Sequence, residues 1–327
     1  IEAAHPVSDG NSILAAQTAL DIACSLGAGE ILLVLLSGGG SALFEKPLID
    51  GGELAALTKQ LLASGADIVE INTIRKRLSA VKGGRFAALC APARVFSVVL
   101  SDIIGDPLDM IASGPAYPDG STTEQALYIV EKYGLALSAE AMALLRAETP
   151  KSLPHVETHV TGSVRQLCAA AETSCRELGY RPTVLTASLC CEAREAGRFF
   201  AAIAAYYQQS RESVAFIAGG ETVVHVRGKG LGGRNQELAL SAAQGIAGMA
   251  DTALFSFGSD GTDGPTDAAG GYVDGRTCAA LEAQGRRIAD ALDDNDAYHA
   301  LRAVDGLLMT GATGTNVNDL TVLLVRR

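Results

Sequence analysis

The sequence predicts an α/β protein with two α/β domains, each with Rossmann-like layers and a mostly parallel sheet. The chain has 327 residues, which suits two domains of about 150 residues each. Short apolar runs alternate along it with longer stretches of helical periodicity. The run Ile31–Leu36 is apolar throughout, which is typical of a strand buried on both faces of a parallel sheet.

The first domain is assigned to residues 1–152, and its elements follow from caps and periodicity. Asp9 or Asn11 can cap a helix that ends at Gly27. Thr122 or Thr123 caps a later helix, which Gly134 stops. The expected elements are helix 13–26, strand 31–36, helix 53–66, strand 94–102 and helices 122–134 and 138–148.

The second domain is assigned to residues 153–327. The stretch 149–158, "TPKSLPHVET", contains two prolines and no periodicity, which marks a boundary. Strands and helices then alternate again, which favours parallel sheets with ligands at the carboxyl ends of strands. The expected elements are strand 158–163, helix 164–179, strand 182–187, helix 191–209, strands 213–220 and 221–226, helix 234–248, and strands 252–260 and 319–327.

Composition excludes several classes of protein. A formal charge of −11 argues against a nucleic-acid partner, and no apolar run is long enough to cross a membrane. Seven cysteines without metal-binding spacing indicate reduced thiols, hence a cytoplasmic protein. The sequence shows no signal peptide and lacks an initiator methionine, so we expect it to be incomplete at its N-terminus.

A glycine-rich loop follows the strand 31–36. Its successive amides, followed by a helix start, suit a phosphate or carboxylate, although a tight turn without a ligand is the alternative. It is not a Walker P-loop, because G-x-x-x-x-G-K-[ST] is absent. The residues concerned are Ser37, Gly38, Gly39, Gly40 and Ser41.

Acidic residues follow the strand 94–102. Asp102 at its carboxyl tip and Asp106 beyond it can accept a proton from a substrate hydroxyl or bind Mg²⁺, or they can simply cap the next turn. Asp109 and Asp119 are interpreted as solvated loop acids.

A basic cluster lies between these two segments: Arg75, Lys76, Arg77, Lys82 and Arg85. Such cations can offset the charge of bound phosphate or carboxylate, and the alternative is a solvated helix face. Arg75 and Lys82 are preferred because their spacing could place them on one helical face.

Two loops of the second domain are candidate nucleotide-binding loops. The first, "GSDGTDGPTDAAGG", holds Asp260, Asp263 and Asp267, which suit a metal–phosphate complex or a polar surface turn. The second offers hydroxyls and open backbone suited to a nucleotide, or forms a plain turn. Its candidate residues are Thr310, Gly311, Thr313, Gly314, Thr315 and Asn316.

Gly228, Gly230 and Gly233 satisfy G-x-G-x-x-G, the pattern of a dinucleotide-binding fold. The acid that this fold needs after the next strand is not at the expected spacing, and Arg234 suits a triphosphate better. No G-x-S-x-G motif supports acyl transfer.

Seven ordered motifs closely resemble those of the glycerate 2-kinases, also called class II glycerate kinases or the MOFRL family. They are "HPVSDGNS", "LLSGGGSAL", "INTIRKRLSAVKGGRFA", "LSDIIGDPLDMIASGPAYPD", "GLGGRNQELAL", "GSDGTDGPTDAAGG" and "TGATGTNVNDL". The resemblance implies ATP-dependent phosphorylation of D-glycerate to 2-phosphoglycerate with Mg²⁺, in a cleft between two domains. The MOFRL region would cover about 213–327. The family usually begins with a further segment, which nothing in this sequence matches.

With this resemblance, the candidate residues acquire roles. Asp102, or failing that Asp106, would receive the proton of the 2-hydroxyl, and Arg75, Lys82 and Arg234 would neutralise charge on the transferring phosphoryl group. Mg²⁺ would be held by one or more of Asp102, Asp106, Asp260 and Asp263, and Asn235 and the two glycine-containing loops would bind substrate or phosphate.

Two other functions stay open. One is an NAD(P)H-dependent hydroxypyruvate reductase. The other is a regulator that binds a nucleotide or sugar phosphate without chemistry. A homo-oligomer is also left open.

Overall fold

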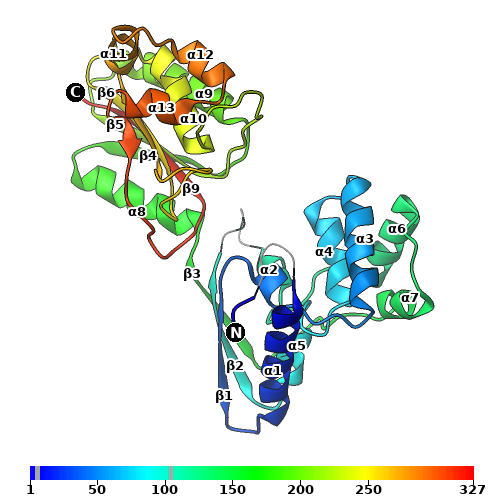
Figure 1. Cartoon of the computed structure of the whole chain (residues 1–327). Helices are drawn as coiled ribbons and strands as arrows, with labels where there is room; N and C mark the ends of the chain where they lie inside the picture. Colours follow the sequence, from blue (N-terminus) through cyan, green and yellow to red (C-terminus); the bar gives the residue numbers. More distant parts are fainter. Residues whose placement is uncertain (4–7, 102, 104, 106) are drawn as a thin grey trace. The chain divides into compact units, whose positions relative to one another are not determined.

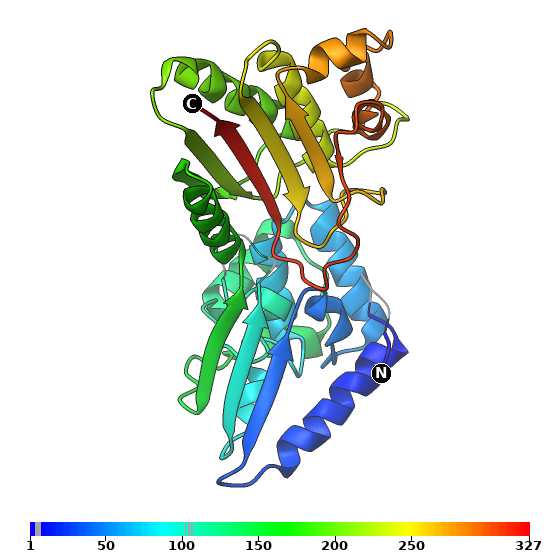
Figure 2. The same ribbon diagram turned by 90° about the vertical axis from the view of Figure 1, so that its left-hand side faces the viewer.

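The sheet of the first unit has three strands in the order β1-β2-β3. β1 (Ile31–Leu36) and β2 (Arg94–Leu100) pair in parallel, from Ile31 opposite Arg94 to Leu36 opposite Val99. β3 (Val156–Gly162) lies beside β2, and its arrow points the same way (Figure 2). The structure is a computed structural model that describes residues 1–3, 8–101, 103, 105 and 107–327. It divides into two units, Ile1–Thr161 and Gly162–Arg327, so β3 belongs to the first (Figure 1).

Helices α1 (Gly10–Ser25) and α5 (Arg85–Leu89) cover one face of this sheet. The carboxylate of Asp9 accepts a hydrogen bond from the Ser12 amide at 2.9 Å, which caps α1 where the sequence predicted. Leu20 of α1 and Phe86 of α5 join Val95 of β2 in a buried apolar cluster. The opposite face of β1 is exposed, so the expectation that this strand is buried on both faces is wrong for the described structure.

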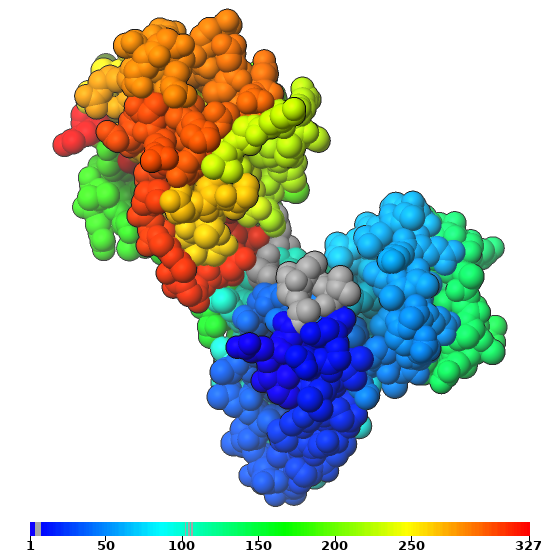
Figure 3. Space-filling view, viewed as in Figure 1, coloured from blue at the N-terminus to red at the C-terminus, as the bar shows by residue number. Residues whose placement is uncertain are grey.

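A second apolar cluster of the first unit joins four helices through Leu61, Ile74, Ile129 and Leu145. These helices are α3 (Gly51–Ala63), α4 (Ile68–Arg77), α6 (Thr123–Tyr133) and α7 (Ala139–Leu145). In the space-filling view, the blue surface of α3 and α4 and the green surface of α6 and α7 form one lobe (Figure 3). Short elements link this lobe to the sheet: α2 (Gly40–Leu43) and the 3₁₀ turn η1 (Ile111–Ser113).

The sheet of the second unit has the strand order β4-β5-β9-β6-β7-β8. Its strands are β4 (Arg181–Leu189), β5 (Val214–Gly220), β6 (Thr252–Gly258), β7 (Gly270–Asp274), β8 (Leu307–Leu308) and β9 (Asp319–Val325). Among the described strand pairs of this unit, only β4 and β5 run parallel, and the others run antiparallel. The prediction of a mostly parallel sheet is therefore wrong for this unit. β9 enters between β5 and β6 at the edge where both of them end, and therefore runs against both.

Helices cover both faces of this sheet. α9 (Ala193–Tyr206) and α10 (Arg234–Gly245) pack on Val214 and Phe216 of β5, whereas α8 (Val164–Glu177) packs on Ile217 from the other side. Three short helices complete the unit: α11 (Thr277–Glu282), α12 (Ile288–Asp293) and α13 (Ala297–Arg302). Residues 221–226, expected as a strand, form only a single bridge between Val223 and Glu192. None of the helices in the described ranges has the length and apolar character needed to cross a bilayer.

Candidate functional site

The glycine-rich loop after β1 is held against η1. Gly39 has φ +79°, a left-handed conformation that favours glycine. A Cβ on Gly40 would lie 2.6 Å from that of Ala112, so only glycine allows this close approach. The hydroxyls of Ser41 and Ser113 lie 3.1 Å apart. The loop predicted to bind an anion is therefore fixed at the carboxyl end of β1 by contacts with residues distant in sequence.

Two of the predicted cations meet beneath this loop, although they do not share a helix face, because α4 ends at Arg77. Arg75 Nη2 and Lys82 Nζ both donate to the carbonyl of Ser41, at 3.2 and 2.7 Å. Lys82 also donates to the Phe44 carbonyl at 3.1 Å. The carboxylate of Glu45 lies 3.3 Å from Arg75 and 3.5 Å from Lys82.

Burial distinguishes the two cations. The Lys82 side chain is fully buried, and this burial lowers its pKa to about 8, with Glu45 opposing the shift. Arg75 keeps 20% of its side chain exposed. Glu45 Oε1 is buried without a hydrogen-bond partner in the described structure. Lys82 thus supports the loop from within, and Arg75 is the cation of this pair that a ligand could reach.

A second charged cluster lies beside α4. Lys76 Nζ contacts Asp109 at 2.8 Å and Asp119 at 3.2 Å, and Thr149 donates to Asp119 at 2.7 Å. Although burial alone would raise the pKa of Asp119, Lys76 and neighbouring hydrogen bonds lower it. The interpretation of Asp119 as a solvated acid is therefore wrong, since it is buried and paired.

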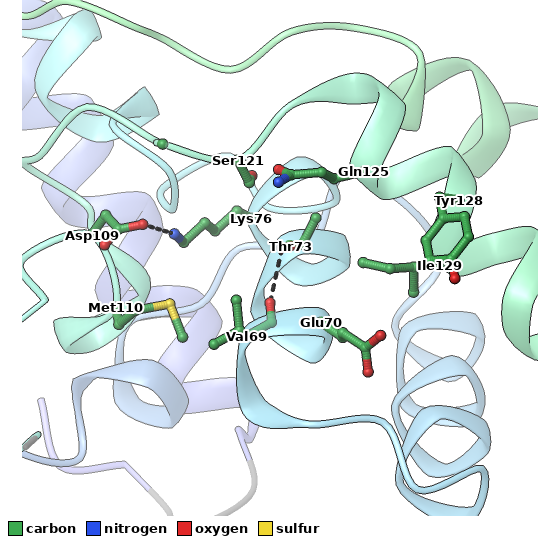
Figure 4. A pocket seen from close by; sticks show the side chains of 11 residues that line it. Val69, Glu70, Thr73, Lys76, Asp109, Met110, Ser121, Gln125, Tyr128 and Ile129 are labelled. Carbon is green, nitrogen blue, oxygen red and sulfur yellow. Dashed lines mark hydrogen bonds and ion pairs between the residues drawn. The ribbon is translucent and has the colours of Figure 1, made fainter.

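A cavity of about 330 Å³ opens beside this cluster, between α4 and α6. Figure 4 shows Lys76 and Asp109 at one end of it and Tyr128 and Ile129 at the other. Of the predicted basic cluster, Lys76 lines this cavity, whereas the preferred cations Arg75 and Lys82 do not. Asp102 and Asp106, the predicted bases, lie outside the described residues.

In the second unit, polar side chains gather where β5 and β6 end and β9 begins. Arg234, the first residue of α10, forms a two-pronged contact with Asp319, with Nε 2.5 Å from Oδ2 and Nη2 3.0 Å from Oδ1. Its Nη1 donates to Glu221 at 2.9 Å. Burial alone would lower the pKa of Arg234, but Asp319 and Glu221 raise it above its ordinary value. The guanidinium is thus a fixed cation that stays partly exposed.

Asp263 caps the start of α10 from a distant loop. It accepts hydrogen bonds from the amides of Asn235 and Gln236, at 3.1 and 2.8 Å, and from the Asn235 side chain at 3.2 Å. Asn235 is itself buried and accepts from Ser256 at 2.6 Å. Burial raises the pKa of Asp263 to about 6. Asp263 was predicted as a metal ligand and Asn235 as a substrate ligand. The Asp263 carboxylate and the Asn235 side-chain amide already hydrogen-bond to other protein groups.

Asp260 and the last loop lie together at the same edge. The Thr313 amide donates to the Asp260 carbonyl at 3.2 Å, and the Thr313 hydroxyl donates to the Ser259 carbonyl at 2.6 Å. The Asp260 side chain accepts from the Thr262 amide at 2.9 Å and stays partly accessible. Thr315 is partly exposed; the other candidate residues of the last loop are exposed, namely Thr310, Gly311, Thr313, Gly314 and Asn316. This loop is available to a ligand.

The G-x-G-x-x-G segment packs on the protein itself. The amides of Gly228 and Gly230 donate to Asn295 Oδ1 and the Asp294 carbonyl, at 2.9 and 2.8 Å. A Cβ on either glycine would lie within 2.5 Å of residues 294–296. These glycines therefore allow a close approach of two chain segments, and their amides are not free to hold a pyrophosphate.

Three charged residues of these regions were missed by the sequence analysis: Glu45, Glu221 and Asp319. Glu221 directly follows the buried strand β5, as Asp260 follows β6, so position alone could have indicated it. Glu45 and Asp319 carry no such signal. Within the described ranges, no three His, Cys, Asp or Glu side chains are placed to hold a metal ion.

The fold and these loops define an α/β protein with polar, glycine-rich loops at the carboxyl ends of β1 and β6. Residues 1–146 match the family described as a domain of unknown function, DUF4147, and residues 214–319 match the MOFRL family. A D-glycerate 2-kinase of Thermotoga maritima is 52% identical over 99% of this chain and 79% of its own length. A glycerate 2-kinase of Pyrococcus horikoshii is 41% identical, over 99% of this chain and 77% of its own.

A crystal structure of glycerate kinase from T. maritima superposes with a TM-score of 0.96, at 52% identity, covering 99% of this chain and 80% of that one. A relative from Agrobacterium vitis, 39% identical over 99% of this chain and 87% of its own length, bears the name putative hydroxypyruvate reductase. The chain belongs to the glycerate 2-kinase family.

Proposed function

We propose that this chain is a glycerate 2-kinase, which transfers the γ-phosphoryl group of ATP to the 2-hydroxyl of D-glycerate. The observation that carries the proposal is the polar edge of the second unit. There a fixed and partly exposed Arg234 lies beside the accessible Asp260 and an exposed loop rich in threonine and glycine. Phosphoryl transfer requires this combination of positive charge, metal-binding carboxylate and phosphate-binding backbone.

Each group has a separate task in the reaction. Arg234 stabilises negative charge on the transferring phosphoryl oxygens, because Asp319 and Glu221 hold its guanidinium in one orientation. Arg75, beneath the glycine-rich loop, offsets the charge of a bound carboxylate or phosphate, while Lys82 keeps the loop in place. Asp102, or failing that Asp106, accepts the proton of the 2-hydroxyl. This last assignment rests on the sequence alone.

Of the predicted magnesium ligands, one described carboxylate suits a magnesium nucleotide and another suits it less. Asp260 has an accessible carboxylate, the ligand type that Mg²⁺ prefers. Asp263 fits less well, because three N–H groups already engage its oxygens. Asp260 is therefore the described carboxylate that would hold the ion, and the accessible threonine hydroxyls from Thr310 to Thr315 would contact the nucleotide. The assignment of Asp102 as a further ligand rests on the sequence alone. The bound Mg²⁺ would neutralise charge on the phosphate oxygens.

The test is ADP release from ATP, measured by a coupled assay with D-glycerate, with related hydroxy acids and without acceptor. We expect release only with Mg²⁺ and glycerate, and mass spectrometry with NMR should identify 2-phosphoglycerate. Asp102→Asn should lower kcat by about 10²-fold or more, and near-normal turnover would remove Asp102 from the role of base. Absence of ADP release despite tight nucleotide binding would favour a non-catalytic regulator instead.

The reductase alternative has weaker support. In its motif, the amides of Gly228 and Gly230 hydrogen-bond to Asn295 and Asp294, and residues 224–227 directly before it form no strand. NADH consumption with hydroxypyruvate, followed at the absorbance of the nicotinamide, is the direct check. We expect none.

We also propose that the chain works in the cytoplasm on small-molecule substrates. All seven cysteines are free thiols, which suits a reducing compartment.

A further inference from the structure

The hydroxyl group of Ser41, in the glycine-rich loop after β1, is held in one hydrogen-bonding role by two other residues. Ser113 donates its hydroxyl proton to Asn72 Oδ1, at 3.0 Å. An amide oxygen can only accept, and a serine hydroxyl has a single proton to give. In the 3.1 Å contact between Ser41 and Ser113, Ser41 is therefore the donor and Ser113 the acceptor. We call these three residues the hydroxyl chain.

The inner end of the hydroxyl chain is fixed by its surroundings. Asn72 lies on α4, and both Asn72 and Ser113 are buried. Ser113 has φ +61°, which is unusual for a residue other than glycine. Such backbone persists where surrounding contacts impose it, and it is concentrated at binding and active sites. Rotation of the Ser113 hydroxyl would remove its hydrogen bond to a buried amide oxygen, so the direction of the chain is set.

Ser41 is the outer end of the hydroxyl chain, and it is partly accessible. Because its proton is donated to Ser113, its oxygen can serve a ligand only as an acceptor. Phosphate and carboxylate oxygens are acceptors too, and this side chain has no donor left for them. A ligand hydroxyl group, which has a proton to give, is the partner that fits.

A cation lies beside this acceptor. Arg75 donates to the carbonyl of Ser41 at 3.2 Å and keeps 20% of its side chain exposed. Lys82 donates to the same carbonyl at 2.7 Å from within the protein, so the backbone of Ser41 is held as well as its side chain. A guanidinium next to a hydroxyl acceptor matches a small acid that carries a carboxylate and a hydroxyl close together.

We propose that Ser41 determines specificity for glycerate, because its oxygen accepts a hydrogen bond from the 3-hydroxyl while Arg75 binds the carboxylate. Ser113 and Asn72 are positioning residues that act through Ser41. The inference rests on the proposed function, in which the 2-hydroxyl gives its proton to the base, so the 3-hydroxyl is the group free to donate to Ser41. A site that pairs with a substrate hydroxyl rejects analogues without it, since its own polar group is left unpaired.

Ligand affinity tests the inference. Titration calorimetry of the 327-residue chain, with Mg²⁺ and a non-hydrolysable ATP analogue, compares D-glycerate with two analogues that keep one carboxylate and the 2-hydroxyl. D-Lactate has a hydrogen in place of the 3-hydroxyl, and hydroxymalonate has a second carboxylate at this carbon, which only accepts. The chain should bind glycerate about tenfold or more tightly than either analogue.

Two variants separate the residue that recognises the hydroxyl from the one that positions it. Ser41→Ala removes the acceptor and should bring the affinities for glycerate and lactate within about threefold of each other. Ser113→Ala frees the proton of Ser41, which can then donate to hydroxymalonate. We expect this variant to bind hydroxymalonate about threefold or more tightly than the wild type does, and glycerate more weakly. A merely structural change would weaken the binding of all three ligands.

The matched control is Ser97→Ala, which removes a buried hydroxyl of β2 that has no hydrogen-bond partner among the described residues. It should leave all three affinities unchanged. Because Ser41 is partly accessible, its variant tests the inference even where Ser113→Ala does not fold.

Three results would overturn the inference. The first is a wild type that binds lactate or hydroxymalonate as tightly as glycerate. The second is a preference for glycerate that Ser41→Ala retains in full. The third is a Ser113→Ala variant that weakens all three ligands by the same factor, which would leave Ser113 a structural role alone. If the wild type releases ADP with glycerate but shows no preference, the proposed reaction stands without this inference. Preference for glycerate without ADP release would contradict the reaction alone.

Discussion

At the level of single residues, the position of Arg234 depends on a carboxylate that begins the last strand. We expect Asp319→Asn to lower kcat about 10- to 100-fold with a smaller change in KM, because the guanidinium loses its charged two-pronged partner and its orientation. Steady-state kinetics with D-glycerate and ATP measure the effect, and Asp319→Glu should recover part of the lost kcat.

The control is another arginine–aspartate pair of the same unit, Arg276 and Asp274, 2.9 Å apart. Asp274→Asn makes the same chemical change away from the polar edge and should leave kcat and KM unchanged. If Asp319→Asn turns over at the wild-type rate, Arg234 needs no orientation by Asp319.

The buried Lys82 leads to a prediction about stability. Lys82→Met removes the donor to two carbonyl groups and one cationic neighbour of the buried Glu45. We expect the free energy of unfolding of the first unit to fall by about 3 kcal/mol, since buried polar groups are left without partners. Urea denaturation measures it. Lys59→Met, at an exposed lysine of α3, should change stability by less than about 0.5 kcal/mol. Equal stability of the two variants would contradict a supporting role for Lys82.

Residues whose role depends on neighbours in the sequence could be predicted. Residues whose role depends on contacts with distant parts of the chain could not. Asp9 is one of the two predicted caps of the first helix, and the structure shows that it caps α1 through the amide of Ser12, three positions away. Asp319 acquires its role from Arg234, 85 positions away, and Glu45 from Lys82. The sequence predicts a solvated acid at Asp119, because nothing nearby in sequence indicates that Lys76 pairs with it.

At the level of elements, the stability that the cap of α10 contributes should depend on pH through Asp263. Burial raises the pKa of this carboxyl from 3.8 to about 6, so the folded state binds its proton more tightly than the unfolded state. The stability that this proton contributes is fully present below pH 3.8 and is lost as the pH rises through 6. The shift corresponds to about 3 kcal/mol.

Comparison with Asp263→Asn isolates this contribution, because all other titrating groups are shared. The difference in unfolding free energy between wild type and variant should change by about 2–2.5 kcal/mol between pH 4 and pH 7, with the wild type relatively more stable at pH 4. A difference that stays constant across this range would show that burial does not perturb Asp263. An NMR titration of the carboxyl carbon gives the pKa directly.

Elements were predicted well where local periodicity is strong and poorly where tertiary contacts decide. Strand 31–36 has the predicted bounds, because six apolar residues between polar segments favour no other structure. Residues 221–226 are predicted as a strand but make one bridge, since the Val223 amide donates to the Cys191 carbonyl and the His225 carbonyl accepts from the Asn295 side chain. β7 was not predicted, because five residues rich in glycine have no recognisable period.

For the whole molecule, the apolar clusters predict how it unfolds. Each of the four clusters draws its buried members from one unit only, two from residues 1–161 and two from residues 162–327. Calorimetry should therefore resolve two transitions. Leu61→Ala, in the helical lobe of the first unit, and Phe200→Ala, on α9 of the second, each remove a buried side chain at a cost of about 2–5 kcal/mol. Each variant should lower one transition by about 5–15 °C and leave the other in place. A single transition that both variants lower equally would mean that the two units unfold as one cooperative body.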